Sequence, residues 1–159
     1  MEWEDVCNDP QLRDLPYKIE LTGAGKIVMS PAKTLHSALQ WAVMQLIDRR
    51  LDNAGRVLPA CPVRTRDNVK VADVAWLSEE RFSRVRDEAA CSVAPEICVE
   101  IMSASNTEQE MRDKRALYLE AGALEVWICG EDGGMRFFDQ AGERESSALV
   151  SGFPGRVQV

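Results

Sequence analysis

Residues 96–102, EICVEIM, form an apolar run with the length and composition of a buried strand, yet a carboxylate, Glu100, stands near its end. A lone charge inside a sheet is energetically costly unless other groups pair with it. The fold must therefore either leave this strand half exposed or surround Glu100 with partners, such as a bound metal ion. Glu100 therefore constrains the fold strongly, because the neighbouring elements must either supply partners for its charge or leave it exposed.

Two kinds of apolar spacing alternate along the chain. Spacing by three and four predicts an amphipathic helix over about 34–51 and a second over about 107–121, which opens with the capping pattern Thr107-x-x-Glu110. The polar segment 78–88 has room for a short helix. The expected strand regions are a hairpin over 17–29, strands over 56–63, 69–77, 96–102 and 125–129, a second hairpin that turns at Gly133-Gly134 into MRFFD, and one or two strands in the tail, roughly 143–159.

This order of elements predicts an α/β (α+β) fold, in which a mixed sheet is flanked by two principal helices. We find no internal repeat or linker, and a chain of 159 residues suits one domain, so residues 1–159 are expected to form a single unit. No stretch approaches the roughly 18–20 consecutive apolar residues of a membrane span. The acidic N-terminal segment does not resemble a secretory signal, which leads us to expect a cytoplasmic protein with no membrane contact.

The cysteines and the net charge limit the classes of function that the chain can have. The five cysteines are widely spaced and form no C-x-x-C pair, which favours reduced thiols. With one histidine and no clustered ligands, the sequence gives no zinc motif. A net charge of −7 argues against tight, nonspecific binding to nucleic acid, which depends on many Lys and Arg contacts to phosphates. It leaves room for a nuclease that gathers acids at a metal site.

Three polar residues occupy positions where the pattern predicts burial. Asp73 lies in the middle of the run 71–77, and strand alternation places Glu100 on the face opposite Ile97, Val99 and Ile101. Lys114 is central on the apolar side of the second helix, so it needs a partner that two carboxylates on neighbouring strands could supply. Asp and Glu oxygens suit Mg²⁺, and a lysine can orient water or neutralise charge on a phosphate. Structural ion pairs, or solvated strand ends with a snorkelling lysine, explain the same pattern.

Three ordered blocks carry a family resemblance: VADVAWL (71–77), APEICVEIMSAS (94–105) and MRDKRALYLEAGALEVWI (111–128). Together with LPYKIELTGAGKIVMSP (15–31), they resemble the Uma-type putative restriction endonuclease family of the PD-(D/E)XK nuclease-like superfamily. That resemblance covers about residues 3–158. It implies a restriction-endonuclease-like fold that cuts phosphodiester bonds of DNA with Mg²⁺ or Mn²⁺.

The resemblance assigns roles to particular residues. Asp73 and Glu100 take the places of the two motif acids. In the metal site that we expect from them, the backbone carbonyl of Ile101 is a further candidate ligand. Met102 stands where the wider motif has lysine, so Lys114 on the helix supplies that function, and Glu20 is an additional member of the site. The departures from the family pattern affect turns and packing more than metal ligation; they are Ala72, Glu96, Ala104, Leu124 and Val126.

The sequence is compatible with more than one function. The favoured hypothesis is a Mg²⁺-dependent DNA endonuclease, and the alternative is a catalytically silent nuclease-fold module that acts as a dimeric binding or regulatory protein. We expect a homodimer only because members of the superfamily often act as dimers. A partner protein that supplies DNA contacts would account for the acidic charge. His36 at a helix start is compatible with a structural or a functional role, and Arg81, Arg84 and Arg86 with a phosphate-steering rim or a solvated face.

Overall fold

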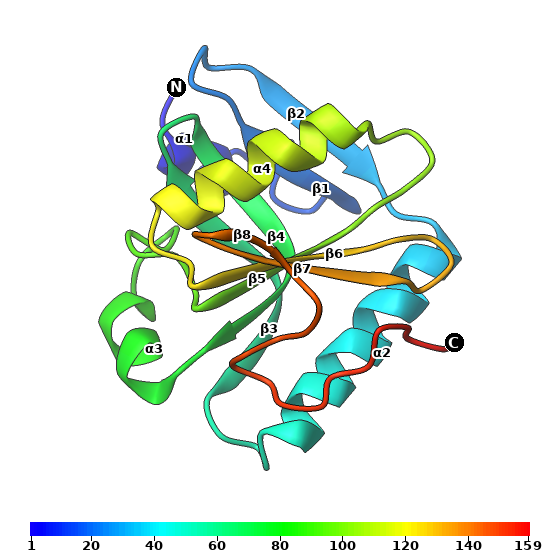
Figure 1. Cartoon of the computed structure of the whole chain (residues 1–159). Helices are drawn as coiled ribbons and strands as arrows, with labels where there is room; N and C mark the ends of the chain where they lie inside the picture. The colour runs from blue at the N-terminus through cyan, green and yellow to red at the C-terminus, as the bar shows by residue number, and fades with distance from the viewer.

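The computed structural model describes residues 1–159, and its elements follow one another as helices and strands of a mixed α and β fold (Figure 1). The helices are α1 (Trp3–Asn8), α2 (Thr34–Arg50), α3 (Glu79–Val85) and α4 (Glu108–Glu120). The strands are β1 (Tyr17–Leu21), β2 (Ile27–Pro31), β3 (Arg56–Thr65), β4 (Asn68–Leu77), β5 (Ile97–Ile101), β6 (Glu125–Cys129), β7 (Met135–Asp139) and β8 (Gly142–Arg144).

All eight strands belong to one sheet in the order β2-β1-β4-β5-β6-β7-β8, with β3 paired to β4. Neighbouring strands are antiparallel except β5 and β6, which are parallel and are joined by the crossover helix α4. The sheet is therefore mixed, and the predicted fold class is confirmed. None of the helices has the length and apolar character needed to cross a membrane.

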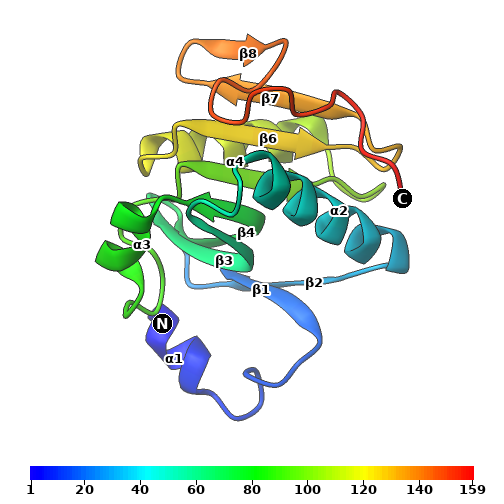
Figure 2. The same ribbon diagram turned by 90° about the horizontal axis from the view of Figure 1, so that it is seen from below.

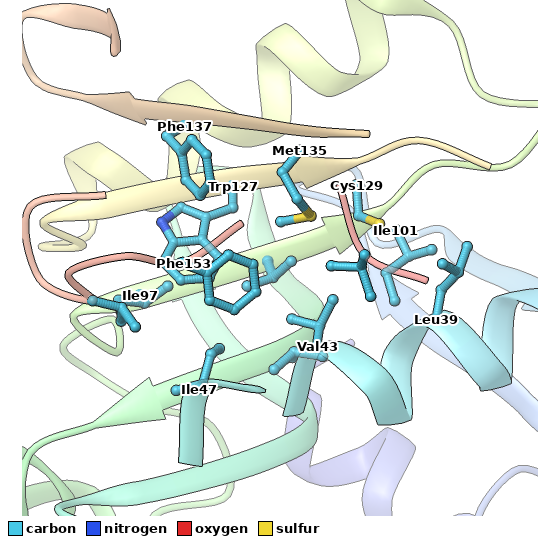
Figure 3. Packing of buried hydrophobic residues seen from close by; sticks show 14 residues of the cluster. Leu39, Val43, Ile47, Ile97, Ile101, Trp127, Cys129, Met135, Phe137 and Phe153 are labelled. Carbon is cyan, nitrogen blue, oxygen red and sulfur yellow. The ribbon is translucent and has the colours of Figure 1, made fainter. Parts of the chain in front are cut away.

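The two long helices pack on opposite faces of the sheet (Figures 1 and 2). Helix α2 buries Leu39, Val43 and Ile47 against the face that carries Trp127, because these residues recur at helical spacing. Figure 3 shows this cluster, in which the Trp127 and Phe153 rings lie 4.6 Å apart between centroids. Helix α4 covers the other face with Met111, Leu117 and Tyr118. Polar side chains that reach the sheet beside these residues are consequently held in dry surroundings.

One edge of β4 is shared by two strands that do not meet. Strand β3 pairs with the other edge from Asn68 to Leu77, with a break in the register at Asp73. On the shared edge, β1 pairs at Val69 and β5 pairs only from Val74 onward. The intervening residues of β4 lack a ladder partner on this edge, so their backbone groups need side chains instead. This gap between β1 and β5 is where the candidate site lies.

The predicted elements agree with the structure through β7, including the two long helices and both hairpins. Thr107 caps α4 by accepting a hydrogen bond from the Glu110 amide, and Gly122 follows the helix with a φ of +114°. Helix α1 was not expected. The tail differs as well, because only β8 is a strand and the rest is irregular. The tail is held by the buried carboxylate of Glu125, which accepts hydrogen bonds from Ser147, Ala148 and Leu149.

The five cysteines are free thiols, as expected, and all but Cys7 are buried.

Candidate active site

Glu100 is buried in β5, with 2% of its surface exposed, and both of its carboxylate oxygens have partners. Oε1 accepts a hydrogen bond from the Tyr118 hydroxyl at 2.6 Å and lies 3.5 Å from Lys114 Nζ. Oε2 accepts from Lys18 Nζ at 2.9 Å. The strand is thus fully buried, and the charge that its sequence carries is compensated by two lysines and a tyrosine.

Asp73 lies in the unpaired stretch of β4 and is 4% exposed. Its Oδ2 atom accepts a hydrogen bond from the Ile101 amide at 2.8 Å, which ties β4 to the end of β5 where the ladder is interrupted. His36 Nε2 lies 3.4 Å from the same oxygen, and Oδ1 accepts from Lys18 Nζ at 3.1 Å. Asp73 is therefore fixed in orientation by a backbone amide, with its second oxygen turned toward Lys18.

Lys18 joins the two acids. Its ammonium nitrogen lies 3.1 Å from Asp73 Oδ1 and 2.9 Å from Glu100 Oε2, so one cation contacts a carboxylate on each of two strands. Lys18 and Glu20 are two residues apart on β1, and strand alternation turns both side chains to the same face. This ammonium group links β1 to the acids of β4 and β5.

Glu20 and Lys114 form the second ion pair of the site. Lys114 Nζ lies 3.0 and 2.9 Å from the two carboxylate oxygens of Glu20, and Oε2 also accepts from the Val71 amide at 2.8 Å. Glu20 thereby satisfies a backbone donor on the unpaired edge of β4. The helix spacing that predicted an inward-facing Lys114 is confirmed, since its side chain reaches the carboxylates from α4.

The charges of the site are unequal, because three carboxylates face two ammonium groups. Burial raises the pKa of Glu100; Lys114 and Lys18 oppose the rise, and Asp73 and Glu20 add to it. Burial would also raise the pKa of Asp73, but the contact with His36, the charge of Lys18 and the Ile101 amide hold it well below its usual range. Within one cluster, Asp73 is thus held ionised while Glu100 is the acid that takes up a proton more readily.

Lysine and tyrosine respond to the same surroundings. Burial would lower the pKa of Lys18, yet the carboxylates, Glu100 first, raise it above its ordinary value. Burial and the charge of Glu100 raise the pKa of Tyr118 well above that of a free phenol. Both groups are consequently protonated donors toward Glu100 at neutral pH.

A cavity of about 370 Å³ opens above these side chains. Its polar lining includes Asp73, Glu100, Lys18, Lys114 and His36. Apolar side chains from β2, α2, β5 and α4, and from the segment after β5, form much of the remaining wall; they are Met29, Leu35, Leu39, Ile101, Met102 and Met111. The volume is within the usual range for small-molecule sites, so a phosphate with part of its nucleotide has room beside the acids.

The donor set fits a hard divalent cation with few protein ligands. Asp73 Oδ1 and Glu100 Oε2 converge on one position that a cationic group already occupies, and carboxylate oxygens are the ligands that Mg²⁺ prefers. The structure contains no group of three or more His, Cys, Asp or Glu side chains arranged to hold a metal ion. Two carboxylates still suit Mg²⁺, which usually keeps several waters and binds substrate phosphate.

Most residues of this cluster were predicted from the sequence, but one central residue was not. Asp73, Glu100, Lys114 and Glu20 come together, and the Ile101 amide contacts Asp73 directly. Lys18 was overlooked, although its two-residue spacing from Glu20 on the same strand could have indicated it.

Two open questions from the sequence concern basic residues. His36 lines the cavity next to Asp73, and its Nδ1 atom is buried without a hydrogen-bond partner. The guanidinium of Arg81 donates to the backbone carbonyls of Ala94 and Gly122, away from the cavity lining. Arg81 therefore has a structural role that is separate from the site.

Comparisons with known proteins identify a similar fold and a family. A crystal structure described as a putative nuclease belonging to DUF820 from Anabaena variabilis superposes with a TM-score of 0.74, covering 96% of this chain and 93% of the other. The two chains are 15% identical, so this likeness concerns the fold. No curated protein matches the sequence. A family model described as "Uma2: Putative restriction endonuclease" matches residues 9–148, and the chain therefore belongs to the Uma2 family.

Proposed function

We propose that this protein hydrolyses phosphodiester bonds of DNA with a bound divalent cation, Mg²⁺ or Mn²⁺. The description of the family and the name of the structural neighbour both refer to nucleases, which supports this class of reaction. The observation that carries the proposal is the convergence of Asp73 Oδ1 and Glu100 Oε2 on one cation position at a cavity. Buried acids that face a shared position in a cavity are a common arrangement for metal-assisted hydrolysis.

In this proposal Asp73 and Glu100 hold the cation, and the backbone carbonyl of Ile101 is a further ligand. When bound, the cation lowers the pKa of a water molecule and stabilises the charge that develops on the phosphate. The Ile101 amide keeps Asp73 Oδ2 engaged, so the carboxylate presents Oδ1 in a fixed direction. The Tyr118 hydroxyl does the same for Glu100 through Oε1.

Lys114 acts beside the attacking water and the phosphate in this scheme. Its ammonium group lies 3.5 Å from Glu100 Oε1 and lines the cavity, where a fixed positive charge stabilises a negatively charged transition state. Glu20 holds Lys114 through two short contacts and is itself fixed by the Val71 amide. Glu20 is thus a positioning residue for Lys114.

The test is cleavage of supercoiled plasmid and of linear DNA in Mg²⁺ or Mn²⁺, with EDTA as the metal-free control. Asp73→Asn keeps an oxygen to accept from the Ile101 amide but removes the charge, so we expect at least a hundredfold loss of rate. A matched control is Asp132→Asn, which changes an exposed acid outside the cavity lining. Equal cleavage by wild type and Asp73→Asn would contradict the proposal.

A second candidate function is a catalytically silent module that binds or regulates as a dimer. The observation that favours it is the lysine pairing, since Lys18 and Lys114 neutralise most of the acidic charge without any metal. Titration calorimetry with Mn²⁺ separates the two candidates. Binding that is lost in Asp73→Asn supports the enzyme, whereas no binding at millimolar Mn²⁺ supports the silent module.

The remaining partners are also proposals. A homodimer would bring two sites to the two strands of a duplex, and light scattering coupled to size-exclusion chromatography measures its mass directly. The net charge of −7 supports a partner protein that supplies DNA contacts, because the chain itself is poor in basic groups for phosphates.

A further inference from the structure

We propose that Lys18 is an internal counter-cation that occupies the metal position of the site and has to withdraw when a divalent ion binds. The inference rests on the metal site of the proposed function and adds a regulation of metal loading to it. It starts from the fact that one ammonium group lies within 3.1 Å of oxygens from both Asp73 and Glu100.

The other oxygens of the two acids are already engaged elsewhere. Asp73 Oδ2 accepts from the Ile101 amide at 2.8 Å, and Glu100 Oε1 accepts from the Tyr118 hydroxyl at 2.6 Å. The oxygens left for a metal ion are Asp73 Oδ1 and Glu100 Oε2, and Lys18 contacts both. A cation that bridges the two carboxylates therefore competes with the Lys18 ammonium for the same atoms.

The second lysine of the cluster provides a contrast. Lys114 Nζ lies 2.9 Å from Glu20 Oε2 but 3.5 Å from Glu100, and none of its contacts is with Asp73. Lys114 can keep its partner Glu20 while a metal ion binds between the two acids. Lys18 has no carboxylate partner outside Asp73 and Glu100, so its ion pairs are lost when the metal enters.

The surroundings of Lys18 allow it to move. Its side chain is 17% exposed and lines the cavity of about 370 Å³, so the ammonium has open volume next to it. A lysine side chain has a flexible four-carbon stem, which lets the charge shift without movement of the strand. In the cavity the displaced ammonium stays near the place that a substrate phosphate would occupy.

Charge balance also favours the exchange. Asp73, Glu100 and Glu20 carry three negative charges when ionised, while Lys18 and Lys114 carry two positive ones, which leaves one negative charge in excess. A divalent ion in place of one ammonium cancels this excess. With the displaced Lys18 ammonium still in the cavity, the balance becomes one positive charge, which suits a phosphate anion. In the absence of metal, Lys18 prevents two buried carboxylates from facing each other uncompensated.

The test compares Mn²⁺ binding by calorimetry in Lys18→Met, which keeps the length and loses the charge, and in Lys114→Met as the matched control. Removing either lysine raises the affinity for cations through its charge alone, so the difference between the variants is the informative quantity. We expect the Kd of Lys18→Met to fall at least tenfold below that of wild type, and the Kd of Lys114→Met to fall by much less. Lys18→Gln serves as a second variant that keeps a hydrogen-bond donor.

The wild-type protein offers a second readout that needs no substitution. With diamagnetic Mg²⁺, the ¹⁵N-detected signal of the protected Lys18 ammonium should shift and exchange faster with water, while that of Lys114 stays protected. The inference would be overturned by unchanged or weaker Mn²⁺ binding in Lys18→Met and Lys18→Gln, or by an equal fall in Kd in Lys18→Met and Lys114→Met. An unmoved Lys18 signal at saturating Mg²⁺ would also overturn it. Tighter Mn²⁺ binding by Lys18→Met, together with no cleavage of any DNA by the wild type, would support the role of Lys18 and contradict the proposed nuclease activity. DNA cleavage by the wild type without tighter Mn²⁺ binding by Lys18→Met would support the nuclease and contradict the role of Lys18.

Discussion

The Tyr118 hydroxyl donates a 2.6 Å hydrogen bond to Glu100 Oε1 in the interior of the protein, where both residues are buried. Helix α4 supplies the tyrosine and β5 the carboxylate, so the bond joins a helix to the sheet at the site. A buried carboxylate needs donors on each oxygen, and this one is the shortest that Glu100 receives. The bond therefore orients Glu100 as well as stabilising it.

Replacing Tyr118 with phenylalanine tests this orientation. The ring keeps its packing, but Glu100 Oε1 loses its hydroxyl donor and retains only Lys114 at 3.5 Å. We expect the free energy of unfolding, measured by urea denaturation, to fall by about 1–2 kcal/mol. Tyr17→Phe on the exposed start of β1 is the matched control and should change stability little. A loss no larger than that of the control would contradict the role given to the hydrogen bond.

Metal affinity should depend on pH through Glu100. Because burial raises its pKa above the ordinary value, a proton competes with a metal ion for this carboxylate. The affinity for Mn²⁺ should therefore rise as the pH increases above the ordinary pKa of a glutamate, about 4.3, because Glu100 loses its proton only at higher pH. Calorimetry in buffers of different ionisation enthalpy should register proton release on binding. An Mn²⁺ affinity that does not change with pH, without proton release on binding, would contradict the raised pKa of Glu100.

Acid stability should depend on Asp73. The pKa of this group is lower in the folded than in the unfolded protein, so its ionised form stabilises the fold. That contribution is present above the unfolded pKa, about 4, and is lost as the pH falls further below it. The difference in unfolding free energy between wild type and Asp73→Asn should be constant from about pH 5 to 7 and narrow below about pH 4. A difference in unfolding free energy that grows as the pH falls below about 4 would contradict a lowered pKa of Asp73 in the folded protein.

The tail is expected to depend on Glu125. Its carboxylate accepts from the Trp127 indole at 2.9 Å and from the Ser147 hydroxyl at 2.6 Å, besides two backbone amides. Glu125→Ala leaves these donors unpaired and should lower the unfolding free energy by about 2–4 kcal/mol. Glu125→Gln keeps one acceptor oxygen and should lose less. Hydrogen exchange should speed up at the Ala148 and Leu149 amides in Glu125→Ala, and unchanged protection there would contradict this anchoring.

The sequence predicts the long elements well because their packing is periodic. The stripe of Leu39, Val43 and Ile47 on α2 faces one core, so its spacing alone indicates what the helix buries. The run of β5 is apolar throughout because both of its faces are buried. Lys114 could be placed for the same reason, since its phase on α4 follows from that of Met111 and Tyr118. These features follow from local geometry that each segment carries in its own sequence.

Features that depend on distant side chains could not be predicted in this way. In the tail, the Ala148 and Leu149 amides donate to the Glu125 carboxylate and not to a strand ladder. Lys18 belongs to the site only because β1 and β5 share one edge of β4, and the register that creates this gap is a property of the sheet. Of the one or two strands expected over 143–159, the structure has one, β8, at the start of the tail, and Lys18 was missed.

The most direct test of the account is a crystal structure of the protein soaked in Mn²⁺, with anomalous scattering measured at a wavelength where manganese contributes strongly. We expect an anomalous peak within coordination distance of Asp73 Oδ1 and Glu100 Oε2, with the Lys18 ammonium moved into the cavity. An anomalous map with no peak between the two acids at saturating Mn²⁺, and with Lys18 still bridging them, would contradict it.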